Sequence, residues 1–413
     1  MGPTATRAEI RRLPLSGTGT ASSAMRLDHF FASVHAESRD QMIARERGTF
    51  DCLTSPLGDS IVLFGAGDLG KYIATGLAKA GIRIRAFADN NPKMWGTDIC
   101  GIPVLKPETA VQEYSADSSF VVTIYQGAAA RKQLHGLGCK VVVPFVPLCW
   151  KHGEIFIPES QLDYPHCIRD SEQNIRDCFN LFADEGSRRE FLDQLRFRYW
   201  LDSKSMAPSK LAKQTYFLVP ARKDEVFADC GALDGDSIRA FIKFSQGHFE
   251  HVIGFEPDPH SNKLLLSYFA SLPEPMRSRA TAFPYAVGSR NEWVEFNATS
   301  SVTSKVIAGG SAKVECRKLD DVAWPKTPSY IKMDIEGAEP EALAGASTLL
   351  ASAHPVVAVC VYHRSQHLWE IPQQIYSISQ DYDIFLRRYA EDCWELVCYA
   401  VPRNRVKSEG ILH

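Results

Sequence analysis

The sequence predicts an α/β protein in which two doubly wound, mostly parallel sheets follow one another along the chain. Apolar runs that end in glycine or acidic turns alternate with segments of helical periodicity, first from Ser60 and again from Glu225. The last two apolar runs are separated only by the short segment AEDC, so they must pair antiparallel. A length of 413 residues suits two such domains preceded by a leader.

Composition excludes several classes of protein. Apolar residues make up 45% of the chain and charged residues 23%, which is ordinary globular usage and argues against a disordered chain. A net charge of -3 without a long basic run argues against partners such as nucleic acid or an anionic membrane. The 11 cysteines include no CxxC pair, so neither a disulfide framework nor a thiolate zinc site is indicated, and a reducing cytoplasm is expected.

We expect four segments along the chain. Residues 1–28 lack the apolar core of a secretory signal and read as a flexible tail, and LDHFFASVHAESRDQMIARE, which begins at Leu27, reads as a helix. Ala342 to His363 carries no charged residue, but His354-Pro355 divides it, so no membrane span is expected. The predicted segments are a tail with a short helix (1–55), a Rossmann-like domain (56–159), a helical bridge (160–215) and a second domain (216–413).

The first domain opens with the strand IVLF, followed by the helix KYIATGLAKAG and the strand IRIRAFAD. Later strands are SFVVTIY and VVVPFV, with a helix between them. The bridge, SEQNIRDCFNLFADEGSRREFLDQLRFRYWLD, has helical spacing of its apolar residues and is expected to form two helices joined around Glu185-Gly186.

A glycine-rich turn in the first domain predicts a nucleotide site. Gly65, Gly67 and Gly70 would provide a tight turn, room for a pyrophosphate and close helix packing, and Asp89 lies where an acidic side chain meets ribose hydroxyls. The ligand would be a dinucleotide or a nucleotide-sugar, since ADNNPKMWGTDICGIPV resembles modules attached to bacterial sugar-modifying and polysaccharide-assembly enzymes. The alternative is a unit without ligand that serves for docking or as the platform of a homo-oligomer.

The second domain repeats the alternation of strands and helices. Its expected strands are EVFADCGA, HVIGFEPD, TAFPYAVG, YIKMDI, PVVAVCVY, YDIFLRRY and WELVCYAV, with a hairpin of WVEFNAT and KVECRKL after the third. Its expected helices are SIRAFIKF, SNKLLLSYFA and EPEALAGASTLL. A parallel sheet with an antiparallel final strand is similar to the class I S-adenosylmethionine-dependent methyltransferase fold.

Turns after the first three strands predict the cofactor site, because open α/β sheets bind ligands at the carboxyl ends of their strands. Glu256 would accept both hydroxyls of a ribose. Tyr285 and Ala286, at the end of the third strand, would lie near the adenine. The spacing of Asp229, Gly231 and Gly235 in the first turn resembles the first motif of these methyltransferases. The resemblance implies that glycines of this turn let the protein backbone approach the amino-acid portion of the cofactor and that carboxylates receive its ammonium. The candidates in this turn are Asp229, Gly231, Asp234, Gly235 and Asp236. The plainer alternatives are an ordinary acidic turn for the segment from Asp229 and an ordinary strand terminus for Tyr285.

Five ordered motifs resemble the FkbM-type methyltransferase family. They are FADCGALDGDS, FEPDP, PYAVG, RKLDD and IKMDIEGAEPEALAGA, and they cover Glu225 to about Leu350, with the later VYHRSQHLWEIPQQI also similar to a branch of the family. The resemblance implies S-adenosyl-L-methionine as cofactor and O-methylation of a hydroxyl on a sugar, a glycan or a secondary metabolite such as a polyketide. It does not name the acceptor.

A charged edge after the fourth strand predicts the catalytic residues. Alternation puts Lys332, Asp334 and Glu336 on one side of the strand. In the usual strand order of the fold that the domain resembles, YIKMDI and PVVAVCVY are neighbours, which would bring His363 beside Asp334 and Glu336. These groups would act as a general base or hold a divalent metal. Each has a plainer alternative: a structural ion-pair partner for Lys332, a helix-capping carboxylate for Glu336 and a surface imidazole for His363, while His367 has no independent support.

Two other functions stay open on the sequence alone. Two Rossmann-like units would also suit a protein that senses nucleotides without catalysis, although the charged edge argues against it. An oxidoreductase dependent on NAD lacks an identifiable acid for hydride transfer in the first domain. The cluster Ser300–Thr303 would share the functional edge of the second domain.

Overall fold

The computed structural model describes residues 23–125, 127–158, 162–202, 206, 216–297, 305–306, 310, 312–390 and 393–411. Their contacts divide them into two compact units. The first unit holds the described residues up to Glu172 and those from Leu195 that precede Met206; the second holds Gln173–Gln194 and the described residues from Met206 onward. None of the described helices combines the length and the apolar character that crossing a bilayer requires.

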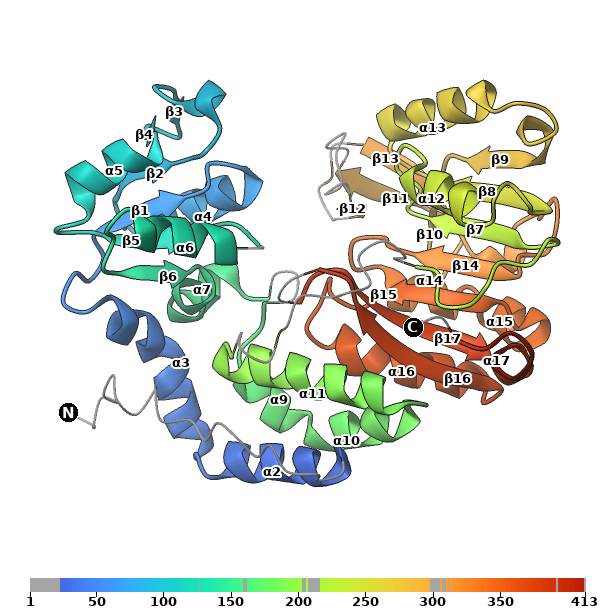
Figure 1. Ribbon diagram of the computed structural model, residues 1–413, viewed down its shortest axis with the longest axis horizontal. Helices are drawn as coiled ribbons and strands as arrows, with labels where there is room; N and C mark the ends of the chain where they lie inside the picture. The colour runs from blue at the N-terminus through green and yellow to red at the C-terminus, as the bar shows by residue number, and fades with distance from the viewer. Residues whose placement is uncertain are drawn as a thin grey trace. The chain divides into compact units, whose positions relative to one another are not determined.

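The first unit is built on a six-stranded sheet of order β3-β4-β2-β1-β5-β6 (Figure 1). All neighbouring strands run parallel except β3 and β4. The strands are β1 (Ile61–Phe64), β2 (Ile84–Ala88), β3 (Asp98–Ile99), β4 (Ile102–Leu105), β5 (Ser119–Val122) and β6 (Val142–Pro144). Strands β1 and β5 are buried at every residue, as expected for a parallel sheet covered on both faces.

Helices flank this sheet and precede it. They are α2 (Ser23–His35), α3 (Arg39–Thr54), α4 (Asp68–Lys79), η1 (Pro92–Met94), α5 (Pro107–Tyr114), α6 (Ala128–Gly136), α7 (Val146–Lys151), α8 (Gly153–Phe156) and α9 (His166–Asp170). The expectation of a tail to residue 28 and one helix after it was wrong, because α2 already begins at Ser23 and Ser38 begins a second helix. Ser38 Oγ accepts the N–H of Gln41 at 3.2 Å, and the Gln41 side chain accepts the N–H of Ser38 at 2.8 Å.

The expected pair of bridging helices is present as α10 (Glu172–Leu181) and α11 (Glu185–Trp200). Helix α11 contributes to both units, since Gln194 belongs to the second and Leu195 to the first. Within the second unit, Ser187 Oγ accepts the N–H of Leu386 at 2.9 Å, so the start of α11 is fixed to the sheet.

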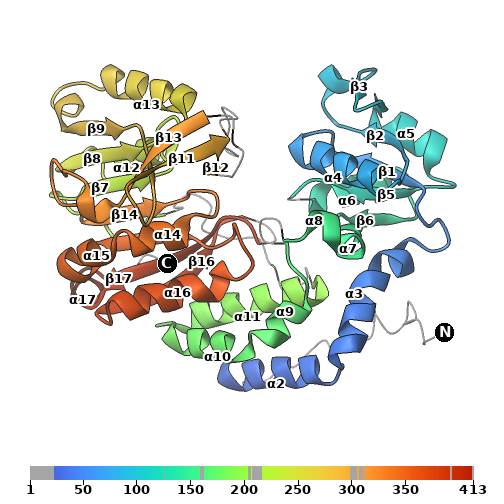
Figure 2. The same ribbon diagram turned by 180° about the vertical axis from the view of Figure 1, so that it is seen from behind.

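The second unit contains a seven-stranded sheet of order β16-β17-β15-β14-β7-β8-β9, which both views show (Figures 1 and 2). Its strands are β7 (Val226–Cys230), β8 (His251–Phe255), β9 (Ala280–Phe283), β14 (Tyr330–Met333), β15 (Val356–Cys360), β16 (Tyr382–Arg388) and β17 (Leu396–Pro402). Strand β17 pairs antiparallel with both β15 and β16, and the remaining pairs are parallel. The predicted methyltransferase-like sheet with an antiparallel final strand is confirmed.

A smaller sheet of order β10-β13-β11-β12 lies in the same unit. Its strands are β10 (Tyr285–Val287), β11 (Glu292–Asn297), β12 (Lys305–Val306) and β13 (Ala312–Arg317). The predicted hairpin is confirmed in that β11 pairs antiparallel with β13. The helices of this unit are α12 (Asp236–Phe244), α13 (Pro259–Ser271), η3 (Arg277–Arg279), η4 (Leu319–Asp321), α14 (Glu339–Ala344), α15 (Ser347–Ala353), α16 (His367–Ile378) and α17 (Arg403–Glu409).

Candidate active site

The candidate site lies where parallel strands of the second unit end. Strands β8, β7, β14 and β15 are consecutive neighbours, so the turns that follow them meet at one edge of the sheet. Gly231 follows β7, Glu256 follows β8, Asp334 follows β14, and His363 comes three residues after the end of β15. The register therefore collects residues that are far apart in the sequence.

Glycine is required in the turn after β7. Gly231 has a φ of +80°, and a Cβ there would lie 2.0 Å from the backbone oxygen of Asp334. Gly235 begins α12 with a φ of +89°, and a Cβ there would lie 2.9 Å from Cδ1 of Tyr268. The first contact places the turn directly against the backbone of Asp334.

Carboxylates of the same turn have partners within the protein. Oδ1 of Asp234 accepts a hydrogen bond from Arg239 at 2.7 Å, and Oδ1 of Asp236 accepts the N–H of Ser237 at 2.7 Å. Asp234 is half-buried and Asp236 is exposed. Both residues thus shape the turn and the start of α12.

Asp229 forms a buried ion pair with Lys332. Asp229 Oδ1 lies 2.9 Å from Lys332 Nζ, and their side chains are 0% and 3% exposed. Lys332 Nζ also donates to the carbonyl of Gly231 at 3.0 Å. The expectation that Lys332 is a structural partner of a carboxylate is confirmed, and the carboxylate that it pairs with is the one expected to receive the cofactor's ammonium.

Glu256 joins the turns after β7 and β8. It is 6% exposed; Oε2 accepts the N–H of Leu233 at 2.8 Å, and Oε1 accepts the N–H of Asp258 at 2.7 Å. Burial raises the pKa of Glu256 to about 7, although these two N–H groups favour the ionised form. The carboxylate is therefore positioned by both turns and titrates near neutral pH.

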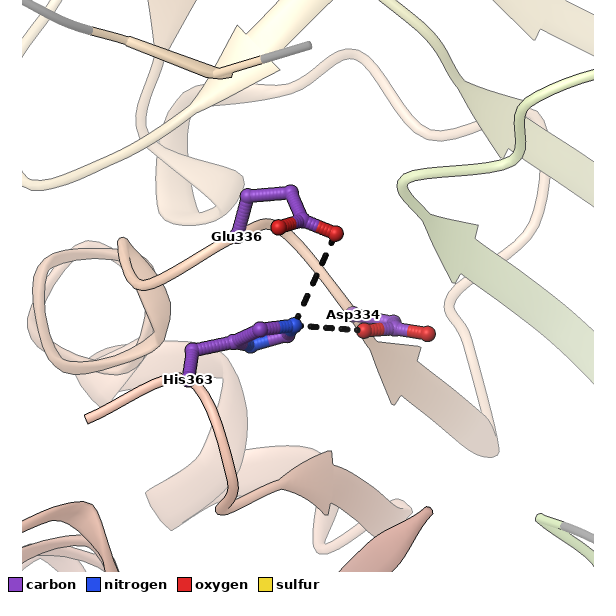
Figure 3. Close-up of side chains that lie close together, drawn as sticks. All are labelled: Asp334, Glu336 and His363. Atoms are coloured by element: carbon purple, nitrogen blue, oxygen red, sulfur yellow. Dashed lines mark ion pairs between the residues drawn. The ribbon is translucent and has the colours of Figure 1, made fainter. Parts of the chain in front are cut away.

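Asp334, Glu336 and His363 converge (Figure 3). His363 Nε2 lies 3.3 Å from Asp334 Oδ1 and 3.6 Å from Glu336 Oε1. The predicted meeting of these residues is confirmed, but Glu336 does not arrive by strand alternation, because β14 ends at Met333. It has a left-handed φ of 57°, a conformation that is costly for a residue other than glycine and concentrates at functional sites.

Two tyrosine hydroxyls hold the Asp334 carboxylate. The Tyr216 hydroxyl donates to Oδ2 at 2.9 Å, and the Tyr362 hydroxyl donates to Oδ1 at 3.2 Å. Burial alone would raise the pKa of Asp334, but the charges of Lys332 and His363 and the Tyr216 hydrogen bond hold that pKa below its usual value. Asp334 is thus ionised at neutral pH.

Glu339 orients the imidazole of His363, and sequence reasoning did not single it out. His363 Nδ1 lies 2.8 Å from Glu339 Oε1, and His367 Nδ1 lies 3.4 Å from Oε2. Burial alone would lower the pKa of His363, but Glu339, followed by Asp334, outweighs burial and raises it to about 9. Glu339 Oε1 also accepts the N–H of Ile335 at 2.9 Å, in the turn that precedes α14.

A signal for Glu339 was present in the sequence. It stands directly before Pro340, in the first turn of a short helix, where a carboxylate is favoured by the helix dipole. Tyr216 had no such signal, because it lies outside every periodic segment. Tyr362 ends an apolar run and reads as an ordinary strand residue.

Residues 229–393 match the family model described as Methyltransferase FkbM domain. The matched segment lies within the second unit, which is therefore similar to FkbM methyltransferase domains. No curated protein matches the chain.

One solved structure extends the likeness beyond residues 229–393. The crystal structure of methyltransferase FkbM from Methylobacillus flagellatus KT is 22% identical with a TM-score of 0.72, covering 92% of this chain and 100% of that one. The fold of both units is therefore shared with that protein. Precorrin-6y C5,15-methyltransferase from Geobacter metallireducens GS-15 is 12% identical (TM-score 0.28; 48% and 94% covered), and RSP, a Rex-family repressor, is 26% identical (TM-score 0.19; 21% and 45% covered).

The prediction that Tyr285 and Ala286 end the third strand of the second unit was wrong. Strand β9 ends at Phe283, and both residues belong to β10 of the smaller sheet. The ring of Tyr285 stacks on that of Phe283 at a centroid distance of 5.7 Å. Ala286 is buried in the apolar core of the smaller sheet, so its side chain is a packing residue. The expected Ser300–Thr303 cluster lies outside the described residues.

The structure brings the glycine turn of the first unit together with Asp89. A Cβ on Gly70 would lie 2.0 Å from the carbonyl oxygen of Gly65, so helix and turn are in close contact, whereas the space beside Gly67 is open. Asp89 Oδ2 accepts the N–H of Ala66 at 2.7 Å. Its Oδ1 accepts a second backbone N–H, two residues further along the chain, at 2.7 Å. Asp89 therefore stabilises the turn itself.

Proposed function

We propose that the chain is an O-methyltransferase that transfers the methyl group of S-adenosyl-L-methionine to a hydroxyl of a sugar, a glycan or a secondary metabolite. The proposal is carried by the position of Asp334: its carboxylate belongs to the Glu336–His363 cluster, and its backbone touches the Gly231 turn. A proton acceptor thus lies directly beside the turn proposed to hold the methyl donor. A protein that only senses nucleotides has no need of such a cluster.

The residues around Glu256 fit the cofactor. Each carboxylate oxygen has two acceptor directions. In Glu256 one direction of each oxygen is used by a backbone N–H, from Leu233 and Asp258, which leaves one acceptor for each of two ribose hydroxyls. Gly231 and Leu233 supply the backbone along which the rest of the cofactor would lie, while Asp234, Gly235 and Asp236 shape that turn.

The chemistry proposed for the cluster is removal of a proton. When bound, S-adenosylmethionine supplies a methyl group on a positively charged sulfur. Asp334 accepts the hydroxyl proton while the acceptor oxygen forms a bond to the methyl carbon; the carbon–sulfur bond breaks, and its electron pair stays on sulfur. His363 and Glu336 hold Asp334 in place, and Lys332 stabilises its charge.

We further propose a cytoplasmic enzyme whose first unit binds a nucleotide or nucleotide-sugar. The cysteines that the structure describes form no disulfide bond, in keeping with a reducing compartment. The open space beside Gly67 supports the nucleotide site, and the double occupation of Asp89 argues for binding through the turn rather than through a ribose contact.

Calorimetric titration of the full chain tests the function. We expect S-adenosylmethionine to bind one site, and radioactive methyl from it to appear in ethers when sugars and other hydroxyl compounds are offered. Failure to bind the cofactor, or label found only on amine or thiol acceptors, would contradict O-methylation. A parallel titration with NADH and a nucleotide-sugar tests the first unit, with Gly67→Val as the variant that fills its open space.

The pH dependence of cofactor binding tests Glu256. Because the pKa of this residue is about 7, it is protonated at lower pH and loses acceptor capacity. The affinity for S-adenosylmethionine should therefore fall as the pH drops below about 7 and level off above it. Glu256→Gln should weaken binding at pH 8 roughly 10–100-fold, as expected for hydrogen bonds to a charged group, and remove the pH dependence.

Exposed Glu292 provides the matched control. Glu292→Gln should keep both the affinity and its pH dependence. Equal pH profiles for Glu256→Gln and the wild type would show that the ribose is bound elsewhere.

A further inference from the structure

His363 carries a buried nitrogen that makes no hydrogen bond to the described residues. The ring is 5% exposed, and its Nδ1 is engaged by Glu339 at 2.8 Å. With Nδ1–H donated to Glu339, Nε2 carries either the second proton of an imidazolium or a lone pair that can bind a cation in place of that proton. No described group donates a hydrogen bond to this nitrogen. Figure 3 shows it directed between the carboxylates of Asp334 and Glu336. Buried polar atoms generally have a partner, so this one requires an explanation.

The three groups have the spacing of ligands to one ion. One ligand atom from each of Asp334, Glu336 and His363 lies within 4.8 Å of the other two, with Nε2 3.3 Å from Asp334 Oδ1 and 3.6 Å from Glu336 Oε1. Atoms bound at about 2.0–2.2 Å to a common cation are separated by at most about 4.4 Å. Small side-chain adjustments would suffice to bind an ion.

The charge of the cluster also favours a cation. Asp334, Glu336 and Glu339 are three carboxylates around the imidazoles of His363 and His367. Lys332, whose charge also stabilises Asp334, is shared with Asp229, to which it is directly paired. The excess of negative charge in a mostly buried place is costly unless a proton on His363 or a metal ion offsets it.

We propose that Asp334, Glu336 and His363 bind a divalent transition-metal cation. A ligand set of two carboxylates and one imidazole suits Mn²⁺ or Zn²⁺ better than Mg²⁺, which prefers oxygen ligands and water. Glu339 behind His363 completes the carboxylate–histidine arrangement that fixes metal-binding imidazoles. Three protein ligands leave positions open for the substrate.

The role of the cation rests on the proposed function, although its binding does not. A hydroxyl coordinated at an open position would have its pKa lowered, which makes its oxygen a better nucleophile beside the Gly231 turn. The two tyrosine hydroxyls on Asp334 and the strained backbone of Glu336 are then the supports that hold two of the ligands.

Titration with Mn²⁺ alone tests the site, with binding to the chelator-treated full chain followed by electron paramagnetic resonance in the absence of cofactor and acceptor. We expect one saturable site. His363→Gln and Glu336→Gln should each weaken it at least 10-fold, and Glu339→Gln, which keeps all three ligands, should weaken it by roughly 10-fold. His248→Gln, at an exposed histidine of the same unit, should leave the affinity unchanged.

Absence of saturable binding to the wild type at millimolar Mn²⁺ would overturn the proposal. So would a Mn²⁺ affinity of the His363→Gln and Glu336→Gln variants equal to that of the wild type. Circular dichroism and S-adenosylmethionine binding of each variant verify that it has folded; Glu336→Gln, on a loop, is the variant least dependent on packing. Methyl transfer that survives metal removal would refute the catalytic role of the cation without contradicting the proposed methyltransferase activity. Failure to bind S-adenosylmethionine would contradict the proposed function without affecting the Mn²⁺ result.

Discussion

Asp334→Asn should lower turnover by roughly 10²–10⁴-fold, the range that general acid–base catalysis contributes, while S-adenosylmethionine binds with nearly unchanged affinity. The amide retains an oxygen that can accept the Tyr216 or Tyr362 hydrogen bond, but it cannot receive a proton at neutral pH. It is also a much weaker metal ligand than a carboxylate. Single-turnover methyl transfer and calorimetric cofactor binding measure the two quantities separately.

The exposed Asp381 supplies the matched control, because its side chain is 75% exposed. Asp381→Asn should keep wild-type turnover. A less than 10-fold loss of turnover in Asp334→Asn would remove this residue from the chemistry. Chelator treatment of the wild type then separates its roles: activity that survives metal removal points to a base, and activity that is lost and restored by Mn²⁺ points to a metal ligand.

Lys332→Met should destabilise the second unit by about 3–5 kcal/mol, the usual loss when one member of a buried ion pair is removed. The substitution leaves Asp229, which is fully buried, without its cation. Burial alone would lower the pKa of Lys332, yet Asp229 and Asp334 outweigh burial and keep that pKa above its usual value, which shows how strongly the site favours a positive charge here. Scanning calorimetry of the full chain measures the loss.

The double variant Asp229→Asn/Lys332→Met separates loss of the pair from creation of an uncompensated charge. It removes both charges and should recover more than half of the stability lost in Lys332→Met. If the free energy of unfolding of Lys332→Met lies within about 1 kcal/mol of the wild-type value, the ion pair is not a main support of the turn.

Periodicity was enough to predict most of the second unit. Fully buried parallel strands such as β7, β14 and β15 are short apolar runs between helices, and this local pattern depends little on tertiary contacts. The break between α2 and α3 was missed because the apolar spacing continues across it, although Ser38 and Gln41 carried the capping signal. Strand β10 was joined to β9 because a single Pro separates them in the sequence.

The candidate site was partly predictable for the same reason. Knowledge that β14 and β15 are neighbours is sufficient to bring Asp334 and His363 to one edge. The Glu339 contact was not predictable, because it depends on the precise turn of chain between β14 and α14. Neither was Tyr216, which comes from outside the sheet and reaches Asp334 through its hydroxyl.

The sequence by itself determined the two α/β units and the acidic and histidine residues at the strand ends of the second unit. These follow from hydrophobic periodicity and from ordered motifs, which are properties of short segments. Only the tertiary structure decided how each charge is used: Asp229 pairs with Lys332, Asp89 stabilises its own turn, and Nε2 of His363 points between two carboxylates. Ionisable side chains reach several ångströms from their backbone, and burial with nearby charges selects their partner, which no local pattern records.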